Sequence, residues 1–159
     1  MLKIIRITFI SLVGVFLLIQ LVPYGRDHTN PTHKVEPQWD KPATRALAKR
    51  ACYDCHSNET VWPWYSHVAP MSWLVMSDVV NGRHEMNFSE WDKPQDEADH
   101  AAKMVNRGKM PLKKYLLMHP EARLTAADRD SLASGLTMTI SADPGVKHKK
   151  SVYGDEINE

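Results

Sequence analysis

The sequence predicts an all-α protein in which an apolar N-terminal helix precedes a small helical domain. Three observations lead to this prediction. A long apolar run follows the first basic residues, four later segments carry apolar side chains at helical spacing, and no segment alternates apolar and polar residues over the length of a strand. The chain has 159 residues and a formal net charge of +1. It therefore has no overall positive field for gathering nucleic acid, and we expect no nucleic-acid partner.

The N-terminal segment, residues 1–24, has the composition of a membrane-spanning helix. Its run ITFISLVGVFLLIQLV, residues 7–22, has Gln20 as its only strongly polar member. As a helix this run spans roughly 24 Å, slightly less than the hydrocarbon core of a bilayer. The residues that follow lack the small-x-small site of a cleaved signal peptide. We therefore expect an uncleaved signal anchor; a cleaved signal and a buried helix of a soluble protein are the alternatives.

The charges around this run predict its orientation. Lys3 and Arg6 precede it, and basic residues beside a membrane span tend to stay in the cytoplasm. We therefore expect a single-pass membrane protein with everything after Tyr24 across the membrane, in a periplasm-like space. Residues 25–40, GRDHTNPTHKVEPQWD, are polar and have no apolar periodicity, which predicts a flexible linker.

Residues 41–140 are predicted to form one helical domain. Asp40 is placed to cap its first helix, with Pro42 in the opening turn. The second helix, within APMSWLVMSDVVNGR, begins near Pro70 and is predicted to stop at Asn81-Gly82.

The second half of the domain contains two more predicted helices. One is expected from about residue 94 to residue 107, and the other begins at Thr125, where Asp128 predicts a capping box. Residues 141–159 are polar and charged, which predicts a mobile tail. A domain of this size needs a covalent staple or a large prosthetic group in its core.

Both cysteines of the chain lie in the motif CYDCH, residues 52–56. Three chemistries use two thiols at this spacing: covalent haem attachment, a redox dithiol, and half of a zinc site. In the first, each sulfur bonds to one vinyl group of the porphyrin, and the histidine that follows binds the iron. In this interpretation Cys52 and Cys55 form the two thioethers and His56 is the proximal iron ligand.

The surrounding residues favour haem over the other chemistries. Zinc needs two more ligands, and the next histidines, His67 and His84, are too far apart for a finger-type pair. A dithiol enzyme places its first cysteine at a helix N-terminus, whereas this pair ends a predicted helix, where the dipole disfavours a thiolate. A disulfide across so short a loop stabilises little. We expect one covalent haem c; the dithiol, the zinc site and inert thiols are the alternatives.

Large aromatic residues follow the motif. A porphyrin is a broad apolar plate, and a small domain must enclose it with large side chains. We expect these aromatic residues to line it, although ordinary core packing would use the same residue types. They are Trp62, Trp64, Tyr65 and Trp73.

The sixth position on the iron has several candidate ligands. Downstream of the motif they are Met71, Met76, Met86, Met104, Met110, Met118, His67, His84, His100 and His119. Met110 lies in NRGKMPLKKY, an irregular segment after Gly108, where Pro111 restricts the neighbouring backbone. Such a loop presents a thioether to a metal without distorting a helix. We expect Met110 to be the distal ligand; an open or water-bound position and His119 are alternatives.

The sequence also resembles a known family. The run CYDCHSNETVWPWYS and the later KMPLKKYLLMHPEARLT are similar to the haem-binding domain family of membrane-anchored bacterial c-type cytochrome-like proteins. The resemblance covers residues 52–136 and implies a small cytochrome c-like helical domain around one haem. It implies covalent haem at Cys52 and Cys55, His56 as proximal ligand and Met110 as distal ligand. The family pattern often reads Met-Pro-Pro, and Leu112 replaces the second proline here.

These residues together predict a membrane-tethered monohaem c-type cytochrome that transfers single electrons to or from a redox partner protein in the periplasm or membrane. Such a carrier is not itself an enzyme. Four basic residues surround Met110 and predict either a rim that attracts an acidic partner or simply a solvated loop. They are Arg107, Lys109, Lys113 and Lys114.

Two other functions stay open at this point. One is a five-coordinate haem sensor or a peroxidase-like enzyme, in which His67 or His84 would act as distal base and Arg83 would stabilise charge. The other is a haem-bearing accessory subunit of a membrane complex.

Overall fold

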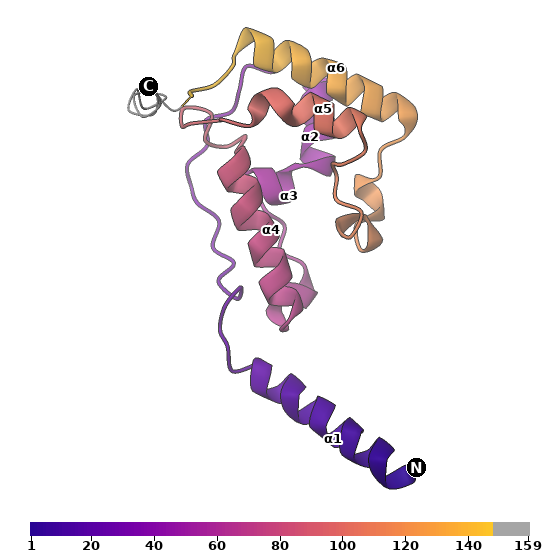
Figure 1. Cartoon of the computed structure of the whole chain (residues 1–159). Coiled ribbons are helices and arrows are strands. Elements are labelled where there is room, and N and C mark those ends of the chain that lie inside the picture. The colour runs from indigo at the N-terminus through magenta and orange to yellow at the C-terminus, as the bar shows by residue number, and fades with distance from the viewer. Residues whose placement is uncertain (148–159) are drawn as a thin grey trace, which may run out of the picture.

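The computed structural model describes residues 1–147, and within them the architecture is all-α, as predicted (Figure 1). Residues 148–159, most of the predicted tail, lie outside the described residues. Over the described range, β-structure is limited to two isolated bridges, Val35 with Glu90 and Pro94 with Val146. In chain order the helices are α1 (Leu2–Ile19), α2 (Pro42–Ala51), α3 (Tyr53–His56), α4 (Met71–Glu85), α5 (Ala101–Asn106) and α6 (Ala126–Ala142), with 3-10 turns η1 (Trp64–His67), η2 (Ala98–His100), η3 (Tyr115–Leu117) and η4 (Pro120–Ala122).

Helix α1 extends away from the domain, and none of its residues is buried (Figure 1). Its 18 residues give a length of about 27 Å, close to the hydrocarbon thickness of a bilayer. It begins at Leu2 rather than Ile7, because the apolar residues among the first six continue the helix. By length and composition α1 is able to cross a membrane, a property that signal sequences share.

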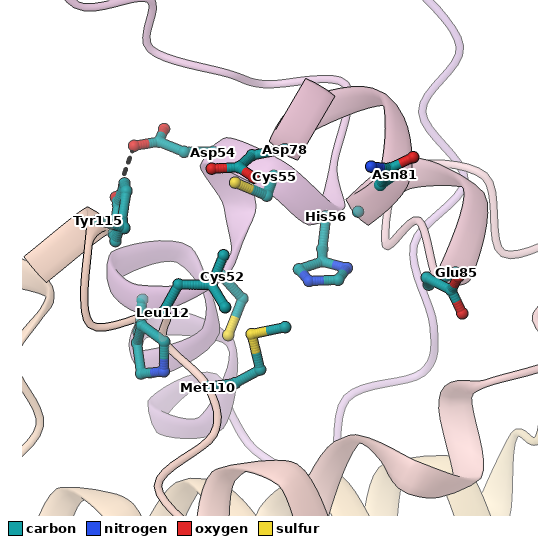
Figure 2. Close-up of a pocket in the computed structure, with 13 residues that line it drawn as sticks. Cys52, Asp54, Cys55, His56, Asp78, Asn81, Glu85, Met110, Leu112 and Tyr115 are labelled. Carbon is teal, nitrogen blue, oxygen red and sulfur yellow. Dashed lines mark hydrogen bonds between the residues drawn. The ribbon is translucent and has the colours of Figure 1, made fainter. Parts of the chain in front are cut away.

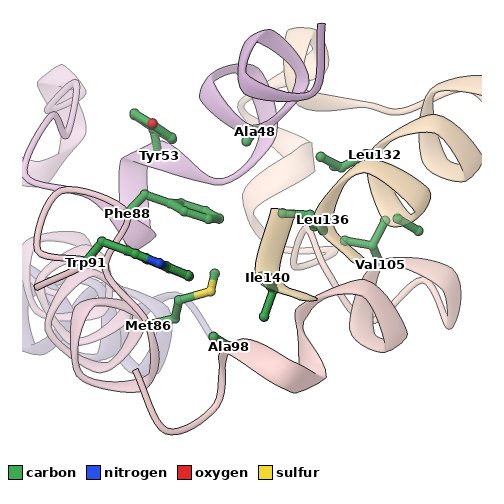
Figure 3. Packing of buried hydrophobic residues seen from close by; sticks show 11 residues of the cluster. Ala48, Tyr53, Met86, Phe88, Trp91, Ala98, Val105, Leu132, Leu136 and Ile140 are labelled. Atoms are coloured by element: carbon green, nitrogen blue, oxygen red, sulfur yellow. The ribbon is translucent and has the colours of Figure 1, made fainter. Parts of the chain in front are cut away.

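The core of the domain lies where α2, α5 and α6 pack together (Figure 3). Ala48, Val105, Leu132, Leu136 and Ile140 are buried there. The small Ala48 allows α2 to approach α6 closely, while the leucines of α6 fill the space beneath it.

An aromatic group extends this core toward α3 (Figure 3). The Phe88 ring is stacked between Tyr53 and Trp91, with ring centroids 5.6 and 5.9 Å away. These rings connect the helical core to the CYDCH segment, so the segment is fixed from its buried side.

Helix α4 continues beyond the predicted stop at Asn81-Gly82 and ends at Glu85. Gly82 serves a close contact between helices. A Cβ atom at this position would lie 2.5 Å from the backbone oxygen of Cys55. Glycine is therefore what allows α4 to pack directly against α3, and the sequence signal for a helix stop was in fact a packing signal.

The ends of the other helices agree only partly with expectation. The capping box of α6 is confirmed: the Thr125 side chain accepts from the Asp128 amide, and the Thr125 amide donates to the Asp128 carboxylate. Helix α2 is preceded by Lys41 rather than capped by Asp40. The helix expected over residues 94–107 begins later than predicted, as η2 and then α5. The buried Gln95 side chain accepts from the Asn87 amide and donates to the Glu90 carbonyl, so residue 95 belongs to the preceding loop.

Residues 25–40, expected to be a flexible linker, lie along the domain. The His28 ring stacks on Trp62 with centroids 4.5 Å apart, and the Asn30 side chain donates to the Thr60 carbonyl at 2.8 Å. Further along, the Trp39 ring packs on Phe88. Polar and aromatic contacts of this kind leave no trace in apolar periodicity, so the sequence pattern did not indicate them.

The first residues of the predicted tail also contact the domain. The Trp91 indole donates to the Asp143 carbonyl at 3.0 Å, and the Gln95 amide donates to the Val146 carbonyl at 2.7 Å. The ordered domain thus extends beyond residue 140 to at least residue 147.

Candidate functional site

Two cavities that share lining residues lie between α3, α4, α5 and the loop that contains residues 110–112, and Figure 2 shows the residues around the smaller one. Their volumes are about 140 and 230 Å³. Both have mostly apolar walls, and the two cavities together are called here the slot. Five residues line both of them: Ala51, Cys52, His56, Glu85 and Met110.

The CYDCH motif reaches the slot because the chain turns sharply at its first cysteine. Cys52 ends α2, and the amides of Cys55 and His56 donate to its carbonyl at 3.2 and 2.9 Å. This single turn forms α3. It brings Cys52 and His56 to both cavities and Cys55 to the smaller one.

The His56 ring projects into the slot (Figure 2). Its Nδ1 lies 3.1 Å from the carbonyl oxygen of Met86, which is only able to accept, so Nδ1 carries the proton. Desolvation lowers the pKa of His56 and favours the neutral ring. Nε2 is therefore left as a free lone pair, the state in which histidine binds a metal.

The family model of haem-binding domains matches residues 14–138. The chain belongs to the haem-binding domain family. The match begins within α1 and ends within α6, so it includes residues 25–40 and the whole slot. The resemblance predicted from the motif segments is confirmed, and with it haem as the bound group. The comparisons with curated proteins and with solved structures found no match.

The slot of this haem-binding domain suits a porphyrin. The larger cavity is walled by apolar side chains from five parts of the chain, and Phe88 is among them. On one edge stand two thiols on one turn and a neutral imidazole nitrogen. The apolar wall residues are Ala51, Met86, Phe88, Ala101, Met104, Val105, Met110 and Leu136.

Met110 reaches the slot from a different element than His56 (Figure 2). Gly108, with φ of +61°, ends the turn after α5 in the left-handed region. The amides of Lys109 and Met110 then both donate to the Met104 carbonyl, at 3.0 and 3.2 Å. The backbone of this loop is therefore held in place, with the thioether directed inward. The structure brings Met110 to the slot; its role as an iron ligand stays a prediction.

Only three of the other candidates for the sixth position line the slot; Met71, Met118 and His119 line a separate cavity, and Met76, His67 and His84 line neither. Met86, Met104 and His100 line the larger cavity of the slot. His119 lies at a separate cavity beside Tyr115. Met86 and Met104 are thus candidate sulfur ligands in the slot other than Met110. The carbonyl of Met86 already accepts the hydrogen bond from His56.

The four aromatic residues expected to line the porphyrin lie outside the slot. Trp62 stacks on His28, Trp64 is 76% exposed, and Tyr65 lines a separate cavity. Trp73 is likewise absent from the slot lining. Phe88 supplies the aromatic wall instead, because the chain returns to α3 after α4 and the Phe88 amide donates to the His56 carbonyl at 2.8 Å.

Glu85 is a slot residue that the sequence did not indicate. It lines both cavities from the last turn of α4. Its spacing of three from Gly82 places the two on one helix face. The sequence alone does not show that this face of α4 contacts α3, so it could not place Glu85 at the slot.

The two thiols are poor nucleophiles in this environment. Desolvation raises the pKa of Cys52 to about 12, and desolvation together with the nearby Asp78 and Asp54 carboxylates raises that of Cys55 to about 12. Both would be protonated at neutral pH, whereas a redox dithiol needs a stabilised thiolate. In residues 1–147, no group of three or more His, Cys, Asp and Glu is placed to hold a metal ion.

The groups considered for peroxidase chemistry point away from the slot. The Arg83 guanidinium donates to the Ser57 carbonyl at 2.8 Å and to Asn30 at 3.0 Å. The His84 side chain is 86% exposed, and His67 packs edge-on against His28. None of the three lines either cavity of the slot.

Proposed function

We propose that this protein is a membrane-anchored monohaem c-type cytochrome that carries single electrons. The observation that carries the proposal is that Cys52, Cys55 and His56 share one turn at an apolar slot in a domain whose family binds haem. Both cysteines would form thioether bonds to one haem, with His56 and Met110 as its two iron ligands. The bound haem would supply an iron that alternates between the ferric and ferrous states.

The protein side chains set the conditions at this site. The hydrogen bond from His56 to the Met86 carbonyl fixes the ring orientation and directs Nε2 into the slot. The apolar walls, including Phe88 and Leu136, exclude water. A thioether from Met110 favours ferrous iron more than a second histidine would, so it raises the reduction potential.

Location follows from α1. We infer that α1 spans the bacterial inner membrane once and that residues after it lie in the periplasm, because Lys3 and Arg6 precede the apolar stretch. A phosphatase reporter fused after residue 147 would be active in this orientation. An inactive fusion, alongside an active cytoplasmic reporter at the same site, would contradict it.

A redox partner protein with an acidic surface fits the loop around Met110. Arg107, Lys109 and Lys113 are exposed there, while Lys114 pairs with Asp78 at 2.7 Å. Electron-transfer rates with an acidic partner should fall steeply as salt rises, since exposed charges are screened. A flat salt response would remove the basic rim from the proposal.

The decisive experiment tests covalent attachment. The full chain is produced in cells competent for cytochrome maturation, denatured, extracted with acidified organic solvent and weighed by mass spectrometry. We expect the mass of the polypeptide plus one haem, and bare polypeptide for the double variant Cys52→Ala, Cys55→Ala. Bare polypeptide from the unsubstituted chain would contradict covalent attachment while leaving family membership intact.

A further inference from the structure

An exposed apolar surface covers the end of the domain that is joined to α1. Its members come from residues 61–74 and from η3 and the residue after it. Trp64 and Leu117 are each 76% exposed, far more than side chains of this size usually are. We name this surface the basal patch; its residues are Val61, Trp64, Val68, Met71, Leu74, Leu117 and Met118.

The basal patch is continuous although its residues come from two parts of the chain. A cavity of about 340 Å³ is lined by residues from both parts, among them Val61, Met71, Leu74, Leu117 and Met118. Trp64 contacts Tyr65 edge-on, and Tyr65 lines the same cavity. Contiguous apolar surfaces of this kind mark sites of contact with another phase or protein.

Formal charge is missing from the main segment of the patch. A quarter of the chain is charged, yet residues 61–77 contain no Asp, Glu, Lys or Arg. At the rim, the Asp54 carboxylate accepts from the Tyr115 hydroxyl at 2.7 Å, and Asp78 pairs with Lys114 at 2.7 Å. The carboxylates nearest the patch are therefore already paired, which lowers the cost of placing them near a surface of low polarity.

The end of α1 is attached to the middle of this patch. The Gln20 side chain donates to the Ala69 carbonyl at 2.9 Å and accepts from the Ala69 amide at 3.0 Å. Arg26 donates to the Gln20 carbonyl at 2.7 Å, and Gly25 approaches the Ser72 backbone so closely that a Cβ would clash. In Figure 1 the η1 turn and the start of α4 face the C-terminal end of α1.

We propose that the basal patch rests on the membrane, with its side chains in the boundary between lipid headgroups and acyl chains. This inference depends on the proposed membrane anchoring of α1. Two hydrogen bonds hold Ala69 at the level where the apolar run of α1 ends, so its neighbours Val68 and Met71 lie at that level too. Trp64 has the amphipathic ring that is enriched at membrane interfaces.

Photolabelling from the acyl chains tests this arrangement. The full haem-loaded chain is reconstituted in phosphatidylcholine–phosphatidylglycerol vesicles that contain a lipid with a diazirine in its acyl chain, then irradiated, digested with trypsin and mapped. We expect labels in α1 and in the peptide 115–123, several-fold above the peptide 130–147. That last peptide carries Met138, an apolar side chain that is 47% exposed on α6 and serves as internal control.

Charged substitutions complete the test. Leu117→Glu should lose the label on peptide 115–123 but keep the label in α1 and the unaltered haem absorption spectrum. Met138→Glu, the matched control, should change neither. Label in α1 but none above control in residues 115–123 would overturn the basal contact, and so would burial of the patch by a second copy or a partner protein. An unlabelled α1 would instead contradict the anchor itself.

Discussion

The slot and the basal patch are both apolar, but the chain builds them in opposite ways. The slot is walled by buried core residues such as Phe88 and Leu136, and its histidine is held by a backbone carbonyl. The basal patch exposes large side chains, such as Trp64 and Leu117, to solvent. The buried slot suits the proposed haem, and the exposed basal patch suits the proposed contact with lipid.

A thin wall separates these two regions. Four residues line both the smaller slot cavity and the cavity of about 340 Å³ at the basal patch: Asp54, Cys55, Asp78 and Tyr115. Their polar ends are joined, Asp54 to Tyr115 and Asp78 to Lys114. The two apolar regions are therefore separated by paired polar side chains and not by a large distance. Substitutions in the slot should therefore leave the basal patch intact.

Replacing the proximal histidine should have the largest effect. His56→Ala removes the one free imidazole nitrogen in the turn, so we expect loss of the low-spin haem spectrum and of electron transfer. Absorption spectroscopy of purified protein measures this. Photolabelling of peptide 115–123 should persist, because the basal patch does not involve His56. A low-spin spectrum in the variant would contradict the assigned proximal ligand.

Removing the thioether at the loop should have the next largest effect. In Met110→Ala we expect high-spin ferric haem, rapid cyanide binding and a lower reduction potential. The control is Met104→Ala, which removes a methionine that lines the same slot from α5. If Met104→Ala gave the high-spin spectrum and Met110→Ala did not, the ligand would be Met104.

A methyl group at Gly82 should destabilise the contact between α3 and α4. Its Cβ would meet the Cys55 carbonyl oxygen at 2.5 Å, and overpacking of this kind typically costs about 1–3 kcal/mol. Gly82→Ala should therefore lower the free energy of unfolding in denaturant titrations. Gly14→Ala is the control, since nothing lies within 4 Å of a Cβ there. Equal stability of the two variants would contradict the close contact.

Loss of the α6 cap should have a smaller effect that is confined to the core. Thr125→Ala removes the acceptor for the Asp128 amide, a change that usually costs about 1 kcal/mol. Thermal unfolding monitored by circular dichroism measures it. Thr137→Ala, whose hydroxyl donates only to the Ala133 carbonyl one turn earlier in α6, is the matched control and should cost less.

The smallest predicted effect concerns pH and the attachment of residues 25–40. Desolvation alone would raise the pKa of Glu36, but hydrogen bonds from Arg45 and Trp39 outweigh it and lower the pKa. A carboxylate with a depressed folded-state pKa stabilises the fold above its ordinary pKa, and this stability is lost as pH falls through the folded-state value. We expect Glu36→Gln to cost less than about 1 kcal/mol at neutral pH and to flatten the acid limb of the stability profile. An unchanged acid limb would contradict the pairing.

The parts of the site that lie close together in sequence could be predicted, and the parts assembled from distant segments could not. The CYDCH turn needs only local hydrogen bonds, so its presence at the slot followed from spacing. A glycine and a proline mark an irregular loop beside Met110, and Met110 does line the slot; its role as an iron ligand stays a prediction. Phe88 and Glu85 reach the slot only because the chain returns past α3 after α4. No local pattern encodes that return, which is also why Trp62 and Trp64 were placed at the haem.

The fold shows the same division. Helix type and the α6 cap follow from residue spacing, whereas the extension of α4 beyond Gly82 depends on a contact with another helix. The docking of residues 25–40 depends on single polar partners, such as Asn30 with Thr60. Polar contacts of this kind are individually weak and leave no periodicity, so composition alone suggested a free linker.

In the proposed membrane-anchored arrangement, the paired hydrogen bonds between Gln20 and Ala69 also affect the rotation of the domain. Two bonds between one side chain and the backbone of one residue resist twisting, so they restrict rotation of the domain about the long axis of α1. The rotational orientation of the domain about the membrane normal would then follow the orientation of α1. A redox partner in the same membrane would then meet the haem domain in one fixed orientation. A flexible linker would instead let the domain present every side to that partner.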